Sequence, residues 1–371
     1  MRIGIPCELK DDEFRVACTP AGVHELVRSD HELLVESGAG IGSSISDAHF
    51  VAAGARIVPT ADEVWGDADL VLKVKEPVPE EYHRMRAGQV LFTYLHLAAA
   101  RECTQAILDA KVTAIAYETV QLQDGSLPLL APMSEVAGRM AAQVGAHTLQ
   151  RDAGGRGVLM GGVPGVCAAE VLVLGAGVGG INAACIALGM QAQVLLLDKK
   201  AAKLREADRI FQGRLRTIAS NAFEIEKACI GADLVIGAVL VPGAKAPTLV
   251  SDDLVAQMKP GSVLVDISVD QGGCFESTRP TTHSDPTFQV HESVFYCVAN
   301  MPGAVPHTST YALTNVTVPY AGAIANHGWR EAVSADPSLA AGVNAVDGML
   351  TCEPAAAAHG FESMTLSEVL G

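Results

Sequence analysis

The sequence has few aromatic residues, 5% of its 371 residues, and it has no run of lysines or arginines. Lys and Arg number 26 against 42 Asp and Glu, which gives a formal net charge of −16. A chain with this acidic balance has no basic patch to neutralise the phosphates of a nucleic acid. We therefore predict that nucleic acid is not a partner.

Paired cysteines and an export signal are also missing. The nine cysteines are scattered, and no Cys-x-x-Cys pair occurs. This pattern is typical of reduced thiols in a cytosol. Residues 1–6 lack the basic region and long apolar stretch of a signal peptide, and Glu8 and Asp11 follow soon after. We expect a cytoplasmic protein.

Charged residues are absent between Glu170 and Asp198, a stretch long enough to suggest a membrane-spanning helix. Four glycines between positions 175 and 180 would interrupt such a helix. The apolar runs on either side are short, as buried strands are. The stretch therefore predicts a strand, a glycine turn, a helix and a second strand, and we expect no membrane partner.

The length and the apolar pattern predict an α/β protein with two domains. A chain of 371 residues exceeds the size at which one hydrophobic core usually stops growing. Strand-like runs at residues 2–6, 32–36, 70–74, 89–93 and 113–117 alternate with amphipathic helical stretches. This alternation predicts a parallel sheet flanked by helices.

A second series of strands and helices opens at residue 171. We expect residues 131–305 to form a Rossmann-type, doubly wound NAD-binding domain. Residues 1–130 and 306–371 would form a second α/β domain, the substrate or catalytic domain. The helical stretch 308–331 would fold back on it, because this stretch has no strand series of its own to cover.

The cofactor prediction comes from a Gly-x-Gly-x-x-Gly motif between an apolar strand and an alanine-rich helix. Gly175 permits a tight turn, Gly177 lets the backbone approach a pyrophosphate, and Gly180 allows the helix to pack closely on the strand. Asp198 follows the next strand, where a carboxylate accepts hydrogen bonds from the adenine ribose. It would repel a 2′-phosphate, which favours NAD over NADP, although Lys199 and Lys200 could soften that preference. The alternative is a tight turn without a ligand.

Two candidate catalytic side chains stand at predicted strand ends, where loops of a parallel sheet face the ligand crevice. Lys75 precedes Pro77 and could hold a carboxylate or a carbonyl oxygen. His96 ends another strand and could exchange protons near neutral pH. Each also has a plain alternative: a solvated lysine, or a hydrogen-bonded structural histidine.

Several blocks make the chain resemble the alanine dehydrogenase family. They are EFRV at 13–16, KEP at 75–77, YLHLA at 94–98, MGGVPGV at 160–166, GAVLVPG at 237–243 and VDISVDQGG at 265–273. The resemblance extends to about residue 350. It implies reversible, NAD-dependent oxidative deamination of L-alanine to pyruvate and ammonia, and a homohexamer.

The resemblance also implies roles for individual residues. His96 and Asp270 match the catalytic pair, and Arg15 and Lys75 match the substrate-binding cations. Cofactor contacts would be Ser134, Gly175, Gly177, Val178, Gly179, Gly180, Asp198, Lys203, Ser220, Val239, Leu240, Ile267, Ser268, Val269, Asp270, Arg279, Val298, Ala299, Asn300 and Met301. Without the resemblance, Asp270 is equally a turn-forming carboxylate.

Two other functions remain as alternatives. The NAD(H)-binding component of a proton-translocating transhydrogenase is similar to alanine dehydrogenase in both domains, and a catalytically silent NAD-binding protein could retain the glycine motif. Arg15, Lys75 and His96 together favour the dehydrogenase. We predict no metal requirement, because His327 has only Ala323 one helical turn before it.

Overall fold

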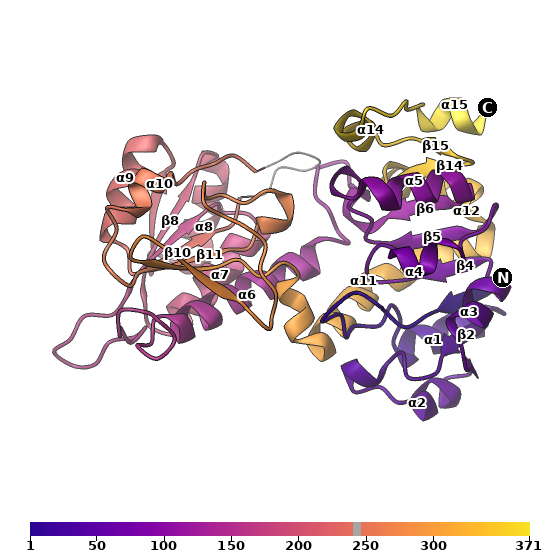
Figure 1. Cartoon of the computed structure of the whole chain (residues 1–371), viewed down its shortest axis with the longest axis horizontal. Coiled ribbons are helices and arrows are strands. Elements are labelled where there is room, and N and C mark those ends of the chain that lie inside the picture. The colour runs from indigo at the N-terminus through magenta and orange to yellow at the C-terminus, as the bar shows by residue number, and fades with distance from the viewer. Residues whose placement is uncertain (240–245) are drawn as a thin grey trace. The chain divides into compact units, whose positions relative to one another are not determined.

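The computed structural model describes residues 1–239 and 246–371, and these form two compact units (Figure 1). Unit 1 comprises Met1–Met133 and Val305–Gly371. Unit 2 comprises Ser134–Ala304. Each unit has its own twisted sheet with helices packed on it, as the alternating pattern of apolar runs predicts.

The sheet of unit 1 has the order β15-β14-β6-β5-β4-β1-β2-β3. Its strands are β1 (Arg2–Ile5), β2 (Glu32–Glu36), β3 (Arg56–Val58), β4 (Leu70–Leu72), β5 (Val90–Thr93), β6 (Thr113–Ala116), β14 (Val343–Val346) and β15 (Met349–Leu350). From β3 to β6 the pairing is parallel, and the order reverses between β1 and β4. The C-terminal strand β14 pairs antiparallel with β6, and β15 pairs antiparallel with β14, an addition that the sequence did not reveal.

The helices of unit 1 begin at recognisable caps. The Thr19 hydroxyl accepts the N–H of Gly22 at the start of α1, and Thr60 caps α3. The longer helices are α1 (Pro20–Arg28), α5 (Arg101–Ala110) and α11 (Pro306–His327). The shorter ones are α2 (Asp47–Ala52), α3 (Ala61–Asp67), α4 (Pro79–Tyr82), α12 (Trp329–Ala335), α13 (Pro337–Ala341), α14 (Glu353–His359) and α15 (Leu366–Leu370).

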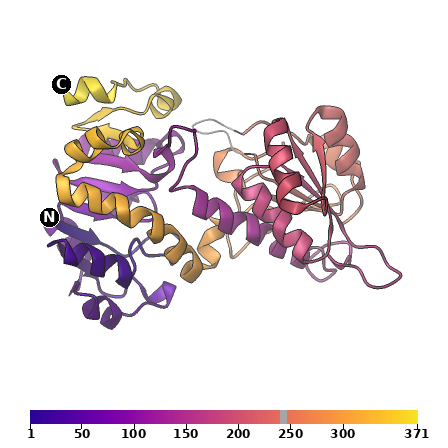
Figure 2. The same cartoon turned by 180° about the vertical axis from the view of Figure 1, so that it is seen from behind.

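The helix α11, the long orange helix in Figure 2, packs beside α1. A Cβ at Gly22 would lie 2.8 Å from Val318 Cγ2, so the glycine allows this approach. The expected helical stretch 308–331 is interrupted at Gly328, whose φ of 76° ends α11 before α12 begins. As expected, α11 belongs to the same unit as the first sheet.

The sheet of unit 2 has the order β12-β13-β11-β10-β7-β8-β9. Its strands are β7 (Glu170–Leu174), β8 (Gln193–Asp198), β9 (Arg216–Ala219), β10 (Leu234–Gly237), β11 (Val263–Asp266), β12 (Thr287–Val290) and β13 (Ser293–Tyr296). All neighbouring pairs are parallel except β12 with β13. This is the strand order of a doubly wound dinucleotide-binding fold, reversing between β7 and β10.

The helices of unit 2 are α6 (Ala131–Thr148), α7 (Val178–Gly189), α8 (Ala201–Phe211), α9 (Ala222–Gly231) and α10 (Asp252–Val255). The first boundary between the units falls inside α6. The stretch without charges, between Glu170 and Asp198, forms β7, the glycine turn, α7 and β8. Among residues 1–239 and 246–371, no helix is both long and apolar enough to cross a membrane.

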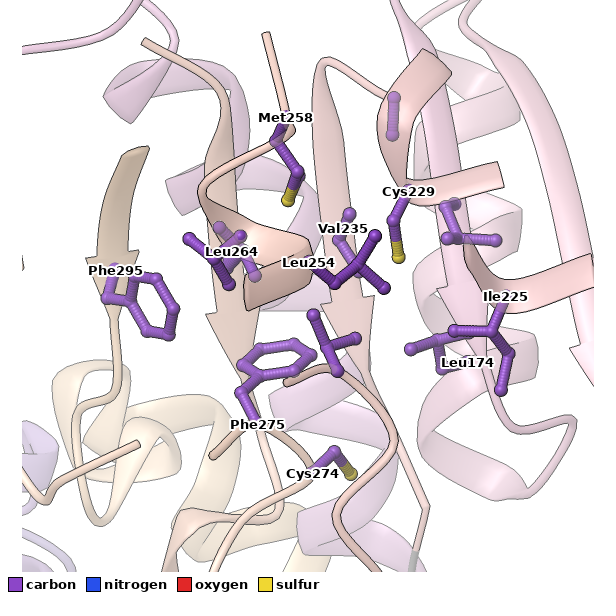
Figure 3. Packing of buried hydrophobic residues seen from close by; sticks show 14 of the residues in the cluster. Leu174, Ile225, Cys229, Val235, Leu254, Met258, Leu264, Cys274, Phe275 and Phe295 are labelled. Carbon is purple, nitrogen blue, oxygen red and sulfur yellow. The ribbon is translucent and has the colours of Figure 1, made fainter. Parts of the chain in front are cut away.

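One hydrophobic cluster of unit 2 packs on one face of its sheet (Figure 3). Val235 and Leu264 come from adjacent parallel strands and pack against Leu254 of α10. Phe275 and Phe295 meet edge to face, with ring centroids 5.9 Å apart. Each such fully buried apolar side chain stabilises the fold by about 1.5–3 kcal/mol. The rigid strands in turn hold the loops at their carboxyl ends.

Candidate active site

In unit 1, the predicted substrate residues follow the strands nearest the point where the strand order reverses. Arg15 lies in the segment after β1, Lys75 follows β4, and His96 follows β5. Because β1, β4 and β5 are parallel neighbours, their carboxyl ends meet at one edge of the sheet. Ligands of open α/β sheets bind at this edge, in the crevice where the order reverses.

Arg15 is 3% exposed and is held by Glu13. Its Nε donates to Glu13 Oε1 at 2.6 Å, and a second guanidinium nitrogen bonds the other carboxylate oxygen. Nη1 lies 3.1 Å from the Met133 sulfur. Burial by itself would lower the pKa of Arg15, but the Glu13 carboxylate outweighs this effect and raises it. The guanidinium is therefore a fixed cation.

A buried ionic group fixes the turn that carries Lys75. Glu8 accepts the N–H groups of Val74 at 2.6 Å and Lys75 at 3.3 Å. Its carboxylate also lies 3.1 Å from Lys73 Nζ, which is 2.9 Å from Glu81. Burial raises the pKa of Glu8, although Lys73 opposes the shift. Segments after β1 and β4 and the helix α4 are joined by these contacts.

Lys75 itself is 7% exposed. Its carbonyl accepts the Thr93 hydroxyl at 2.9 Å. Within the residues that the structure describes, its ammonium has neither a hydrogen bond nor an ion pair. The Lys75 charge acts on the neighbouring Glu76. Burial by itself would raise the pKa of Glu76, but the charges of Lys75, Lys10 and His96 lower it. A buried cation without a direct partner is suited to hold an anionic or carbonyl oxygen.

His96 stands in the left-handed backbone region, with φ 47° and ψ 39°. Its N–H donates to Glu118 Oε1 at 2.6 Å, and the Leu95 N–H donates to the same oxygen at 3.1 Å. The imidazole lies parallel to the Tyr94 ring, with centroids 5.8 Å apart. The His96 side chain remains 28% exposed and is open to a substrate.

The three predicted residues of unit 1 share neighbours. Tyr94 stacks on His96 and interacts electrostatically with Arg15. The charges of both Lys75 and His96 lower the pKa of Glu76. The structure thus gathers two cations and an imidazole into one region of unit 1.

In unit 2, the glycine turn connects β7 to the N-terminus of α7. Gly175 has a φ of 102°, which favours glycine, and a Cβ at Gly180 would lie 1.8 Å from the Gly175 carbonyl oxygen. Gly177 differs: its φ is −78°, and among the residues that the structure describes a Cβ there would meet only Lys203 Nζ, at 3.8 Å. Since the described part of the fold does not require glycine at 177, the missing side chain leaves space for a ligand at a helix N-terminus.

Asp198 ends β8 beside this turn. Its carboxylate accepts the Ala176 N–H at 2.8 Å and the Lys200 N–H at 2.7 Å, and its carbonyl accepts the Ser220 N–H. A carboxylate has about four acceptor positions, so both ribose hydroxyls could still bind. The glycine turn, Asp198 and Ser220 therefore lie together, with Lys203 of α8 beside Gly177.

The residues 267–270 form a loop at the carboxyl end of β11, and buried Asp266 holds it in shape. Asp266 accepts the N–H groups of Ser268 at 3.0 Å and Cys274 at 2.8 Å, and the Thr278 hydroxyl at 2.6 Å. Burial raises the pKa of Asp266, although these hydrogen bonds oppose the shift. Val269 is buried and Asp270 is exposed, so the loop presents the Asp270 carboxylate to solvent.

The remaining cofactor predictions fall on other parts of unit 2. Ser134 lies in α6, Val178 and Gly179 begin α7, Val239 follows β10, and Ile267 follows β11. Val298, Ala299, Asn300 and Met301 follow β13, where Asn300 has a φ of 70°. Arg279 stacks its guanidinium 4.1 Å from the Phe288 ring centroid. Leu240 lies outside the described residues.

No three His, Cys, Asp or Glu side chains of the described chain are grouped so as to hold a metal ion. His327 is the last residue of α11.

Sequence reasoning missed the carboxylates that organise both regions. Glu8 and Glu118 bond to residues 67 and 22 positions away along the chain, whereas Glu13 and Asp266 bond to residues 2 to 12 positions away. Position offers one signal: Glu118 and Asp266, like Lys75 and His96, stand at or just after strand ends.

Comparison with known proteins covers nearly the whole chain. Residues 4–137 match the family model described as alanine dehydrogenase/PNT, N-terminal domain, and residues 141–353 match the corresponding C-terminal domain. An alanine dehydrogenase from Mycobacterium tuberculosis is 65% identical over 353 residues, 95% of each chain. One from Halomonas elongata is 53% identical over 371 residues, 100% of each chain.

Solved structures agree with these matches. A structure of L-alanine dehydrogenase superposes with a TM-score of 0.93 at 49% identity, covering 97% of this chain and 99% of the other. A transhydrogenase structure from Sinorhizobium meliloti gives a TM-score of 0.79 at 25% identity, covering 94% and 98%.

Proposed function

Because the chain belongs to the alanine dehydrogenase/PNT family, we propose that it is an enzyme catalysing the reversible, NAD-dependent oxidative deamination of L-alanine to pyruvate and ammonia. One observation carries the proposal in the structure. A buried lysine ammonium without a direct partner in the described chain, Lys75, shares the acidic neighbour Glu76 with His96 at the ligand-binding edge of a sheet. Such a pair fits a small 2-oxo acid.

We assign substrate binding to unit 1. Arg15 and Lys75 would hold the substrate carboxylate and the carbonyl oxygen through charge-assisted hydrogen bonds. Glu13 and Glu8 keep these two residues in place, so less orientation has to be gained when the substrate binds. We propose residues 1–130 and 306–371 as the substrate and catalytic domain.

We assign NAD to residues 131–305. The open space at Gly177 and the N-terminus of α7 fit a pyrophosphate, and Asp198 fits the adenine ribose. The proposed site is completed by the other predicted contacts, which are Ser134, Gly175, Val178, Gly179, Gly180, Lys203, Ser220, Val239, Leu240, residues 267–270, Arg279 and residues 298–301. When bound, NAD accepts the hydride that leaves the substrate Cα.

Proton transfer is assigned to His96 and Asp270. Loss of hydride from alanine leaves an imine, water adds to the imine carbon, and ammonia departs. We propose that the partly exposed His96 and the exposed Asp270 move the protons of these steps. The net reaction converts alanine, NAD⁺ and water into pyruvate, ammonium, NADH and a proton, so alkaline pH favours oxidation.

The first test is NADH formation from NAD⁺ and a panel of small L-amino acids, measured at alkaline pH. We expect turnover with alanine, and a loss of about 10²–10⁴-fold in His96→Ala, the range for a general acid or base. His24→Ala, an exposed histidine on α1, is the matched control and should keep wild-type activity. NAD binding without turnover on any amino acid would refute the proposal.

A transhydrogenase component is the alternative that a structural match favours, because both units align with one. That structure is 25% identical to the chain, whereas the alanine dehydrogenases named above are 53–65% identical. Alanine-dependent NADH formation by the protein alone would exclude this alternative.

We further propose a cytoplasmic homohexamer that acts on small molecules and has no nucleic-acid or membrane partner. The family resemblance supports the hexamer. The acidic charge of −16 and nine free cysteines support the other parts of the proposal.

A further inference from the structure

A carboxylate next to His96 has no role in the function proposed so far. Glu118 lies in the short helix η3 (Tyr117–Thr119), directly after β6. His96 follows β5, and β5 and β6 are parallel neighbours. Their carboxyl ends therefore bring Glu118 and His96 together, although 22 positions separate them along the chain.

The contacts of Glu118 are mostly with the backbone. One oxygen, Oε1, accepts the N–H of His96 at 2.6 Å and that of Leu95 at 3.1 Å, and Oε2 lies 3.3 Å from the Leu95 nitrogen. The imidazole Nδ1 is 3.8 Å from Oε1, which is too long for a hydrogen bond. Glu118 thus binds the peptide that carries the imidazole and leaves the imidazole itself free of a hydrogen bond to it.

This peptide adopts a conformation that needs support. His96 has φ 47° and ψ 39°, in the left-handed region that costs energy for a residue with a Cβ. Two successive N–H groups, of Leu95 and His96, donate to one side-chain oxygen, so both donors are satisfied within the turn. These hydrogen bonds offset the cost of the left-handed turn, and the turn directs the imidazole along the face of Tyr94.

Glu118 has no Lys or Arg partner among the described residues. Its side chain is 12% exposed, and its nearest cationic neighbour is the His96 imidazole, with Nδ1 3.8 Å from Oε1. The other charged or titratable groups facing His96 are Glu76, from the turn after β4, and Tyr94. Glu76 is ion-paired with Lys10, whereas Glu118 accepts the N–H groups of the His96 backbone.

We propose that Glu118 is a positioning residue, which holds the Leu95–His96 peptide in the left-handed turn that aims the His96 imidazole at the substrate. The proposal rests on the proposed function, in which His96 moves protons. It predicts that the hydrogen-bond acceptor at position 118 matters and that the negative charge matters little.

The test compares Glu118→Ala with Glu118→Gln. The alanine variant lacks the acceptor, so kcat should fall by about 10- to 100-fold, as misplaced catalytic groups do. The amide oxygen of the glutamine variant can accept the same N–H groups, so kcat should stay within about threefold of wild type. KM for pyruvate and affinity for NADH should change little in both. Glu102→Ala, an exposed glutamate on α5, is the matched control.

Two results would overturn the proposal. Wild-type kcat in Glu118→Ala would show that the turn does not need its acceptor. Equal losses in the two variants, with unchanged melting temperatures, would show that the charge acts and that the hydrogen bonds do not.

Amide hydrogen exchange gives a readout that is independent of turnover. The Leu95 and His96 amides should exchange faster in Glu118→Ala than in Glu118→Gln. If the wild type failed to oxidise alanine, this comparison would still decide whether Glu118 holds the turn. Failure of the proposed function and failure of this inference are therefore distinguishable.

Discussion

The three glycines of the motif at β7 act through different physical causes. Gly175 adopts a positive φ. At Gly180 a Cβ would lie 1.8 Å from the Gly175 carbonyl oxygen, so no larger residue fits there. Gly177 does neither: any residue can adopt its φ of −78°, and among the described residues only Lys203 Nζ lies within 4 Å of its Cβ position. The fold therefore explains two of the glycines, and a ligand best explains the third.

Substitutions at Gly177 and Gly180 should therefore have different effects, one on cofactor binding and the other on stability. Gly177→Ala should melt at the wild-type temperature, but its Kd for NADH should rise at least about tenfold, because the new methyl group would occupy space proposed for the pyrophosphate. Gly180→Ala should instead lower the melting temperature. Titration of NADH fluorescence and thermal denaturation measure the two effects. Unchanged NADH affinity in Gly177→Ala would contradict the assignment of this turn to the cofactor.

Gly189→Ala is the matched control. Gly189 is the last residue of α7, and a Cβ there would meet no atom of the described residues within 4 Å. Its substitution should leave NADH affinity unchanged and should not lower the melting temperature.

At the scale of elements, the turn after β4 depends on a buried ionic group. Lys73 is fully buried between Glu8, after β1, and Glu81, in α4. Exchanging such a group for apolar residues can be neutral, but removing one partner leaves uncompensated charge in the interior. Both glutamates also bond to backbone N–H groups, so neither can leave without disturbing the turn.

We therefore expect Lys73→Met to lower the free energy of unfolding by about 3–5 kcal/mol. Lys10→Met removes the partner of Glu76 in a partly exposed pair and should cost no more than about 1 kcal/mol. Denaturant titration of both variants measures the difference. Similar small losses would mean that Lys73 contributes nothing beyond an ordinary surface pair.

The defect in Lys73→Met should also depend on pH. Burial already raises the pKa of Glu8, and Lys73 is the cation that opposes this shift. A carboxyl whose pKa is raised by folding stabilises the fold below its ordinary pKa, and this contribution is lost as pH rises through the raised pKa. Removing Lys73 raises the pKa further. The destabilisation should therefore be smaller at acidic pH than at neutral pH, as denaturant titrations at several pH values would show.

At the scale of the whole molecule, the chain is divided unequally between its units. Unit 2 is one continuous segment, Ser134–Ala304, whereas unit 1 needs residues from both ends of the chain. Unit 2 has its own core, formed around Leu264, Phe275 and Phe295. A continuous segment with its own core is expected to fold alone.

We predict that residues 134–304, expressed alone, fold and bind NADH but do not oxidise alanine. Arg15, Lys75 and His96 are absent from this fragment, whereas the glycine turn and Asp198 are present. Binding should raise the melting temperature, since a ligand at 100 times its Kd stabilises a fold by about 2.7 kcal/mol. A folded fragment that does not bind NADH would contradict the assignment of the cofactor to this unit.

The sequence by itself predicted the α/β class, a dinucleotide-binding fold and the alanine dehydrogenase family, and each of these is confirmed. The roles of His96, Asp270, Arg15, Lys75 and the cofactor residues stay predictions. The sequence signals of the fold are local, because a strand, a glycine turn, a helix and the next strand occupy about 30 consecutive residues. Physical causes that act within such a short segment are readable from the order of residues.

Only the tertiary structure decided which distant residues meet. Glu118 reaches His96, Glu8 reaches Lys73, and the C-terminal strand β14 reaches β6 because sheet pairing brings strand ends together. A carboxylate in the sequence carries no mark of its partner, since an exposed glutamate and a buried one are the same residue. Burial and hydrogen bonding decide what each of these carboxylates does, and both arise only when the sheet has formed.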